Sequence, residues 1–562
     1  QPPERVGEAS LGLAPGVRFE PMETATPADV SAALEEILRD DLNVDLSRVT
    51  RESRLVDDVG LDSVAFAVGM VAIEDQLGGA RSAEDLLKLL GARGIRVRTF
   101  AAWTAALCRR LTRGLPETVR HDAPWAVARF KRHPALLPLL QRLARRRRDE
   151  FLERLLALKQ IGPELHRALA APPPATLKEA LGRARTAWRR HLERHPELAT
   201  LRDKLERFFT AEEHALYDLN TDRRELFLSR ELLEEAVAAS GGELAADTVR
   251  ELLARTALQF ALSTEEQFRG LYPQGLDQFR TLDGAGIDAG TPAELAGTMD
   301  REDAAVLLLL LEAKGGLPGD ARFRRCRHLY LDEAQEFSRL ELALIRRTMT
   351  RETRLSVSGD FTQLMRPVEA GQDWDTLLAA LDRSTAARGT LRINYRSSRQ
   401  VAAFSLAVLG PLAGTDVPDA RRDGEPVLYS RFADAAARGR VLREGLVALR
   451  RTSPGATVAV LTAEPRQAEA LYQEIAGIPG TELVLHGSWS RESGILVTTV
   501  DRIKGLEFDL VILPCADPES FPDTTLARRQ LHVAASRAMQ QLWTGTLGDF
   551  SPLLDPLLPH GS

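Results

Sequence analysis

The second half of the chain alternates short apolar segments with helical ones, and this pattern restricts the fold more than any other feature. Alternation of strand and helix is typical of a parallel sheet covered by helices. In such sheets, ligands bind at the carboxyl ends of the strands. The sequence therefore predicts an α/β fold, with its chemistry in the residues that follow these strands. The segments with strand character are His328–Leu331, Arg354–Ser358, Thr457–Leu461, Ile495–Thr499 and Leu510–Pro514.

The middle of the chain has helical character instead. From about Trp125 to Leu311, leucines recur at helical spacing among many Arg and Glu residues. Pro172–Pro174 and Gly241-Gly242 divide this block into shorter segments. Before the block, Ile95–Phe100 alternates like a strand and leads into a predicted helix at Ala101–Leu111. We expect a large helical unit before the sheet.

The first predicted strand is followed by two adjacent carboxylates, Asp332 and Glu333. A lone Asp-Glu pair is more often a solvated acidic loop. At a strand end, however, one carboxylate can hold Mg²⁺ and the other can orient an attacking water. The second strand ends in Gly359–Gln363. The amide of Gln363 can sense a phosphate, although Gly-Asp alone is only a turn signal.

Three further segments place basic and aromatic residues after strands or on a helix. Leu391–Ser398 sets Arg396 beside an aromatic ring, which offers a phosphate clamp and a stacking face. Thr498–Asp509 follows another strand. Arg529–Ala538 puts Arg537 on a predicted helix, where its guanidinium can neutralise charge on a transferring phosphoryl group.

The order of these segments resembles motifs II to VI of UvrD/Rep-type helicases of superfamily 1. The matching stretches read DEAQ at 332–335, GDFTQ at 359–363, NYRSS at 394–398, TTVDRIKGLEFD at 498–509 and LHVAASRA at 531–538. Five motifs in the family order over about 200 residues make a specific match. The resemblance implies two RecA-like lobes that close over ATP and Mg²⁺. It also implies an ATP-dependent helicase or translocase acting on single-stranded or partly duplex DNA.

The resemblance also assigns a role to each matching residue. Asp332 would bind Mg²⁺, and the catalytic set would be Glu333 as base, Gln363 as coupling residue, and Arg396 and Arg537 at the γ-phosphate. The nucleotide would be held by Tyr395, Lys504, Gly505 and Glu507, with Tyr395 stacked on adenine. Arg98–Trp103 resembles the family's TFxxW-type DNA-contacting motif, so the expected DNA contacts are Thr99, Phe100, Trp103 and Thr499.

The sequence departs from the family pattern at the phosphate cradle. The chain contains no G-x-x-x-x-G-K-[ST] P-loop, and the adenine-reading Gln segment before it is also missing. Catalysis of phosphoryl transfer depends mainly on positioning and charge stabilisation. We therefore expect turnover to be reduced by orders of magnitude, and an inactive family member stays an alternative.

Two other departures affect the expected DNA path. After Gln363 the chain reads Leu-Met-Arg-Pro where the family usually has an aromatic that stacks on a base. Asp501 stands in motif V where a His is common, and a carboxylate repels phosphate. The run Arg145–Arg148 can contact backbone phosphates, but a solvated helix face is the favoured interpretation.

The N-terminal part carries a second specific signal, Asp57–Val64, in which Ser63 stands at a helix start after an acidic loop. An isolated Ser there is usually an N-cap, but a phosphodiester would gain from the free N–H groups and the helix dipole. With its flanks, Thr26–Leu87 resembles an acyl carrier protein of mycobactin-type siderophore biosynthesis. Its helices would be Ala28–Leu42 and Val64–Leu77.

The resemblance to a carrier implies that Ser63 accepts 4'-phosphopantetheine from coenzyme A and carries a thioester-linked acyl group. Between Glu23 and Lys88 there are fifteen acidic and six basic side chains, a net charge of -9 in a chain whose total is -6. That charge suits docking on the basic surfaces of acyl-transfer enzymes. The last carrier helix, expected beyond Leu87, runs directly into the helicase-like segment from Gly91.

The predicted fold class is α/β, with two RecA-like parallel-sheet lobes, a large helical insertion and a small N-terminal all-α carrier-like segment. The expected divisions are a tail (1–21), the carrier-like module (22–90), a first-lobe part (91–124), the helical insertion (125–300), the rest of the first lobe (301–390), the second lobe (391–550) and a tail (551–562).

Three functions stay open at this stage. The chain is a helicase-family motor, a carrier fused to a non-catalytic helicase-like scaffold, or a HelD-like module that binds RNA polymerase. The cysteines, Cys108, Cys326 and Cys515, are widely separated, and the N-terminus has no apolar signal region. The apolar run Ala304–Leu311 is too short to span a bilayer. A cytoplasmic protein without a membrane contact is expected.

Overall fold

The computed structural model describes most of the chain beyond Thr99. The described residues are 99–112, 114–157, 173–268, 280, 284, 286–288, 290–317, 328–390, 393–394, 396–414, 419–420, 422–485, 494–503 and 505–558. The carrier-like module of residues 22–90 with Ser63 lies outside them, as do Cys326, Tyr395 and Lys504.

The helical character predicted between Trp125 and Leu311 is confirmed. The helices before the first-lobe strands are α4 (Phe100–Leu111), α5 (Trp125–Arg132), α6 (Leu136–Leu156), α8 (Leu177–Arg194), α9 (Ala199–Leu216), α10 (Leu219–Leu228), α11 (Arg230–Ala239), α12 (Asp247–Gln259), α13 (Thr264–Gln267) and α14 (Asp303–Ala313). The strand character predicted for Ile95–Phe100 does not extend to Phe100, which is the first residue of α4. Thr99 caps α4 by accepting from the Ala102 N–H, which draws Phe100 into the helix.

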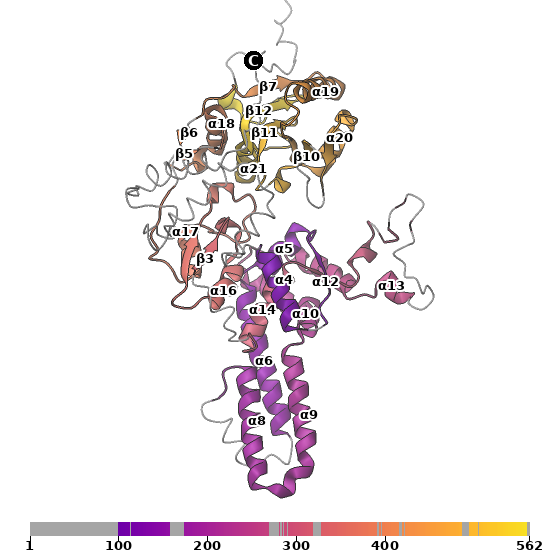
Figure 1. The fold of residues 1–562 in the computed structure, drawn as a ribbon, viewed down its shortest axis with the longest axis vertical. Helices are drawn as coiled ribbons and strands as arrows, with labels where there is room; N and C mark the ends of the chain where they lie inside the picture. The colour runs from indigo at the N-terminus through magenta and orange to yellow at the C-terminus, as the bar shows by residue number, and fades with distance from the viewer. Residues whose placement is uncertain are drawn as a thin grey trace, which may run out of the picture.

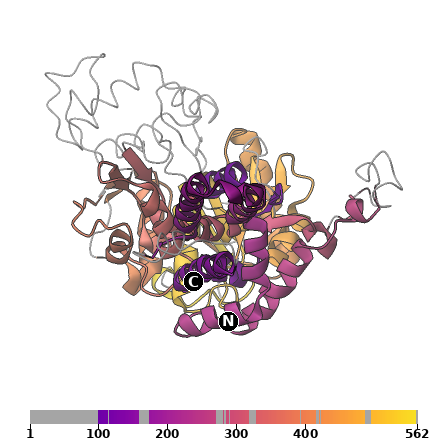
Figure 2. The same ribbon diagram turned by 90° about the horizontal axis from the view of Figure 1, so that it is seen from below.

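Helices α6, α8 and α9 form a stalk that projects from the rest of the molecule (Figure 1). Figure 2, seen from below, shows these helices nearly end-on. Phe151, Trp188 and Phe209 fill the core of the stalk and are almost fully buried. The charged residues lie outside, where Arg185 of α8 pairs with Glu206 of α9. Long apolar stripes with charged outer faces account for this packing.

The Arg145–Arg148 run lies on α6 and agrees with a solvated helix face. Three of its members have acidic partners, because Arg146 pairs with Glu150, Arg147 with Glu225 and Arg148 with Asp149.

The first lobe, here the described residues of 328–390, contains two parallel strands, β3 (His328–Leu331) and β4 (Arg354–Val357). Helix α16 (Arg339–Thr348) connects them, and α17 (Trp374–Ala380) packs against α16. A second parallel pair, β1 (Thr118–Arg120) with β2 (Thr298–Asp300), lies in the helical part. The apolar run Ala304–Leu311 is the buried body of α14.

The second lobe, here the described residues of 393–558, contains a six-stranded parallel sheet in the order β7-β12-β11-β8-β10-β9. Its strands are β7 (Leu428–Arg431), β8 (Val458–Thr462), β9 (Thr481–Leu483), β10 (Ile495–Thr499), β11 (Phe508–Leu513) and β12 (Ala538–Thr546). The pair β5 (Ile393–Asn394) and β6 (Asp419–Ala420) lies beside it. Parallel strands need helical crossovers, which explains the alternation in the sequence.

Helices cover both faces of this sheet (Figure 1). Alternate strand residues point to opposite faces, so Ala459 and Val511 join the core under α18 (Arg399–Leu409) and α21 (Thr525–Ser536). Val460 and Ile512 join the core under α19 (Ala435–Thr452) and α20 (Pro465–Ile475). The α/β class is thereby confirmed. Arg537 is the C-cap of α21 and not a residue inside it, because the chain turns there into β12.

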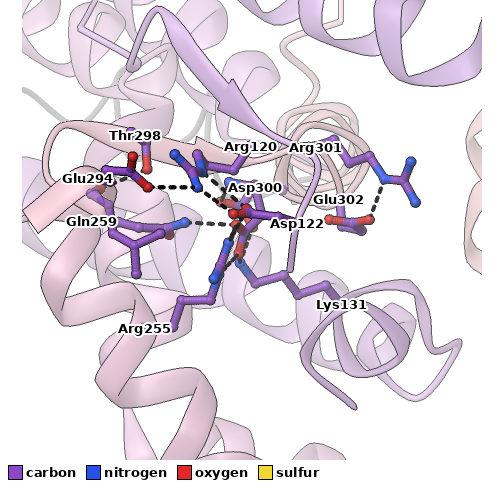
Figure 3. A network of polar contacts seen from close by, with 12 residues as sticks. Arg120, Asp122, Lys131, Arg255, Gln259, Glu294, Thr298, Asp300, Arg301 and Glu302 are labelled. Carbon is purple, nitrogen blue, oxygen red and sulfur yellow. Dashed lines mark hydrogen bonds and ion pairs between the residues drawn. The ribbon is translucent and has the colours of Figure 1, made fainter. Parts of the chain in front are cut away.

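Within the helical part, a buried network of charges ties α5 and α12 to the end of β2 (Figure 3). The Asp300 carboxylate accepts from Lys131 of α5 at 2.8 Å and from Arg255 and Gln259 of α12 at 2.8 and 2.9 Å. Lys131 and Asp300 are both fully buried. Burial alone would raise the pKa of Asp300, but Lys131 and Arg255 outweigh it and hold the pKa below its ordinary value. The carboxylate therefore stays charged in the core.

Among the helices that the structure describes, none has both the length and the apolar composition needed to cross a membrane. Cys108 and Cys515 are buried, and neither is paired with another cysteine.

Candidate functional site

The carboxylate pair predicted after the first strand lies in the tight loop that follows β3. This loop contacts the chain just beyond the end of β4, where the Ala334 N–H donates to the Ser358 carbonyl. Glu333 has a φ of 50°, a left-handed conformation that few non-glycine residues adopt and that is concentrated at functional sites. Ser358 donates to the Asp332 carboxylate. Gln335 donates to Glu333 at 2.6 Å and accepts from the Asp360 N–H at 2.9 Å. These bonds join the loops after the two strands.

The two loops approach each other at Gly359. A Cβ atom on Gly359 would lie 2.4 Å from the Gln335 Oε1 and 3.0 Å from the Ala334 nitrogen. Because any side chain would push the loops apart, glycine is required here. Beyond it, Gln363 donates to the Asp360 carboxylate at 3.0 Å. The contacts fix Gln363 relative to Glu333.

The opposite side of the site comes from the second lobe. The Arg396 Nε lies 2.6 Å from the Glu507 carboxylate, which links the segment after β5 to the start of β11. The Asn394 side chain accepts from the N–H groups of Arg396 and Ser397, which fixes the turn that presents Arg396.

Arg537 joins the two sides. It donates to the Gln363 Oε1 at 2.6 Å and to the Val533 carbonyl of its own helix at 3.3 Å. Burial lowers the pKa of Arg537, and the nearby positive charge of Arg396 adds to this. Glu333, Glu507 and Asp360 act in the opposite direction. Two guanidinium groups and the Glu333 carboxylate thus share one electrostatic environment at the junction of the lobes.

The structure brings together most of the residues predicted to surround a nucleotide. Asp332, Glu333 and Gln363 come from the first lobe, and Arg396, Glu507 and Arg537 come from the second. Gly505 lies within motif V, shortly before β11, with a φ of 75°, a backbone conformation suited to glycine.

Of the four residues predicted to contact DNA, Thr99 is exposed, and the other three are half-buried or buried. Phe100 packs edge-on against Phe337 at 5.4 Å and tilted against Trp103 at 5.6 Å. Both aromatic rings are half-buried against the core of the helical part. Thr99 is exposed at the start of α4, and Thr499 is buried at the end of β10.

Sequence reasoning missed His532, which links the lobes from α21. Its Nδ1 lies 2.8 Å from the Ser405 hydroxyl of α18, and its Nε2 lies 3.3 Å from the Thr362 hydroxyl of the first lobe. The only signal in the sequence is its place within motif VI, on the buried face of the predicted helix. A histidine on such a face is usually a satisfied core residue, so this signal would not have identified the contact.

The pH dependence of stability should report on His532. Burial lowers its pKa, Arg537 adds to this, and Asp360 and the Ser405 bond oppose it. The unfolded chain then binds a proton more readily, so the stability contribution is complete above about pH 6.5 and is lost as pH falls toward the folded pKa. We expect His532→Gln to show a smaller loss of stability than the wild type between pH 7 and pH 5 in urea unfolding. Identical pH profiles would contradict this assignment.

Comparisons with known proteins agree with both resemblances, to helicases and to acyl carrier proteins. Residues 494–544 match the family of UvrD-like helicase C-terminal domains, and residues 32–92 match the phosphopantetheine attachment site family. Acyl carrier protein MbtL of Mycobacterium sp. (strain MCS) is 76% identical over 66 residues, which are 12% of this chain and 74% of that protein. The MbtL protein of Mycobacterium bovis is 70% identical over 64 residues, 11% of this chain and 76% of that protein.

A search of solved structures found the C-terminal domain of a possible DNA helicase from Lactobacillus plantarum WCFS1. It is 24% identical and covers 29% of this chain and 94% of its own, with a TM-score of 0.25. A TM-score this low does not establish a shared fold.

The fold and the sequence matches together define a protein with an α/β body, a helicase-like C-terminal domain and a carrier segment. The chain carries a UvrD-like helicase C-terminal domain, and its N-terminal segment belongs to the acyl carrier protein family.

Proposed function

We propose that the body of this protein binds a nucleoside triphosphate with Mg²⁺ between its two lobes and binds single-stranded DNA. The observation that carries the proposal is the contact between Gln363 and Arg537, which joins motifs III and VI across the lobes at 2.6 Å. Glu333 lies close enough to affect the pKa of Arg537. The two RecA-like lobes of the family are the architecture that we infer from this arrangement.

The side chains present fit these ligands. Asp332 is exposed and offers carboxylate oxygens, the ligands that Mg²⁺ prefers. The positive charge of Arg396 disfavours the charged form of Arg537, and an anion placed near both would relieve that repulsion. When bound, Mg²⁺ would neutralise charge on the phosphate oxygens. The residues of this chain would hold the triphosphate and orient a water through Glu333.

The missing P-loop limits what this site can do. Because the phosphates lack an amide cradle and its lysine, we propose that the body binds ATP and turns it over slowly at most. Calorimetric titration with ATP in the presence of Mg²⁺ tests the binding step. Absence of measurable binding, with or without single-stranded DNA, would overturn the nucleotide part of the proposal.

We also propose that Ser63 carries 4'-phosphopantetheine, with acyl-transfer enzymes as partners of the carrier segment. The match to acyl carrier proteins over three-quarters of their length supports this. The matches reported above give no support to the alternative of an RNA polymerase-binding module.

Modification of the carrier segment gives an all-or-none prediction. After incubation with coenzyme A and a phosphopantetheinyl transferase, the intact protein should gain the mass of one phosphopantetheine group. Ser63→Ala should abolish the gain, whereas Ser82→Ala, a serine elsewhere in the same segment, should retain it. Intact-mass spectrometry of the three proteins decides this, and an unmodified wild-type chain would sink the carrier assignment.

A further inference from the structure

Five consecutive residues of the first lobe, Thr362–Arg366, run along the second lobe; we call them the seam. The first two contacts are those of Thr362 with His532 and of Gln363 with Arg537. The third is a bond of 2.9 Å from Arg529 of α21 to the carbonyl of Leu364. Helix α21 and its C-cap residue therefore hold three neighbouring residues of the first lobe.

The fourth seam residue is embedded in the second lobe. Met365 is 7% exposed and belongs to the apolar core that contains Val401 and Phe404 of α18. Exposing this side chain would return apolar surface to water, which is unfavourable. The seam thus joins the lobes by packing as well as by hydrogen bonds.

The fifth seam residue makes an ion pair within reach of solvent. Arg366 pairs with Asp501, which follows β10 in the second lobe, and their side chains are 41% and 30% exposed. The guanidinium carbon of Arg366 lies 6.0 Å from the ring centre of Trp125, at the start of α5. Arg366 is therefore positioned between an acidic group and an aromatic face.

Arg366 and Asp501 are also the positions at which the sequence departs from the UvrD/Rep pattern along the expected DNA path. Arg366 follows Gln363 in the stretch that lacks the stacking aromatic, and Asp501 replaces the common His of motif V. The structure places these two departures in contact. The Asp501 carboxylate, which would repel a phosphate, is paired with the Arg366 guanidinium from the first lobe.

We propose that Arg366 and Asp501 form a latch between the lobes, and that a backbone phosphate of single-stranded nucleic acid opens it by replacing Asp501 on Arg366. Ion pairs this exposed are weak and are screened by salt, so a phosphate can compete for the guanidinium. The half-buried Trp125 ring offers a face beside the incoming strand. The inference rests on the proposed DNA-binding function. It adds that the Arg366–Asp501 pair regulates the access of single-stranded nucleic acid to the site.

Binding of a labelled oligothymidylate, measured by fluorescence anisotropy at several salt concentrations, tests the latch. Asp501→Asn removes the competing carboxylate and should tighten binding about three- to tenfold. Arg366→Gln should weaken binding and make the slope of log K against log salt shallower by about 0.7, the value for one lost phosphate contact. Asp375→Asn is the matched control, because it frees the exposed Arg388 elsewhere in the first lobe, and it should change affinity less than twofold.

The outcomes separate the latch from the DNA-binding proposal. If the wild type binds the oligonucleotide but Asp501→Asn behaves like Asp375→Asn, the latch is overturned and DNA binding stands. If none of the proteins binds, both proposals fail together.

Hydrogen exchange of the peptides around 361–368 and 496–503 gives a second readout without DNA. Each single change should speed exchange there, and the swap Arg366→Asp with Asp501→Arg should restore protection without restoring affinity. A swap that leaves exchange fast would also overturn the latch.

Discussion

Replacing Asp300 by asparagine is expected to lower the free energy of unfolding of the helical part by about 3–5 kcal/mol, the usual cost of breaking a buried ion pair. Asp300 is fully buried, and its two carboxylate oxygens accept from Lys131, Arg255 and Gln259. Figure 3 shows these groups converging on it. Asparagine has nearly the same shape, so the loss comes from the missing charge. The amide leaves buried cations without full compensation.

Hydrogen exchange of the amides in β1, β2 and α12, measured at increasing urea concentrations, gives the free energy of unfolding around the Asp300 network. The Asp300→Asn variant is compared with the wild type in this way. Asp247→Asn on α12 is the matched control, because Asp247 is 92% exposed and 3.8 Å from Arg250. Exposed pairs of this kind contribute little, so the control should stay within about 0.5 kcal/mol of the wild type. Because the pKa of Asp300 is lowered, the wild-type advantage should persist at every pH above about 4 and shrink only in stronger acid. Equal stability of the two variants would contradict the role of the network.

The central strands of the second lobe, β8, β10 and β11, could be predicted from sequence because they are buried on both faces. Continuous apolar runs identify such strands locally, and β10 coincides with the predicted Ile495–Thr499. Strand β12 (Ala538–Thr546) was not predicted, since it begins at the last residue of motif VI and contains two glutamines. Strands β1 and β2 have three residues each, too few for a recognisable period.

The candidate site was predictable only residue by residue, through the resemblance to a family. Spacing alone does not show that Gln363 and Arg537 meet, because that contact depends on how two lobes dock. For the same reason the sequence identified Asp501 as an unexpected carboxylate but did not identify Arg366 as its partner. The links through His532 and Arg529 also cross between lobes. Local patterns predicted elements well, whereas these pairings come from tertiary packing.

Substitution of Arg537 should remove the ability of the site to distinguish a triphosphate from a diphosphate. Arg537 is 3% exposed and is held by Gln363 and by the end of α21, so its guanidinium is fixed before any ligand arrives. A hydrogen bond to a charged group contributes about 1.5–3 kcal/mol, which corresponds to roughly a 10- to 150-fold change in affinity. We therefore expect Arg537→Ala to lose about 10- to 100-fold in ATP affinity with little change for ADP.

Calorimetric titration of ATP and ADP with Mg²⁺ measures this preference in each variant. The affinity for ADP serves as an internal control, since it shows that the site is still folded. Arg537→Lys keeps a charge but lacks the planar fork, so it should fall between the wild type and Arg537→Ala. Arg528→Ala on the same helix removes an arginine that pairs with Asp523 at 2.7 Å, and it should leave the preference unchanged within about twofold. If Arg537→Ala still prefers ATP as the wild type does, Arg537 does not face the terminal phosphate. The contact between Gln363 and Arg537 would then be a structural link between the lobes alone.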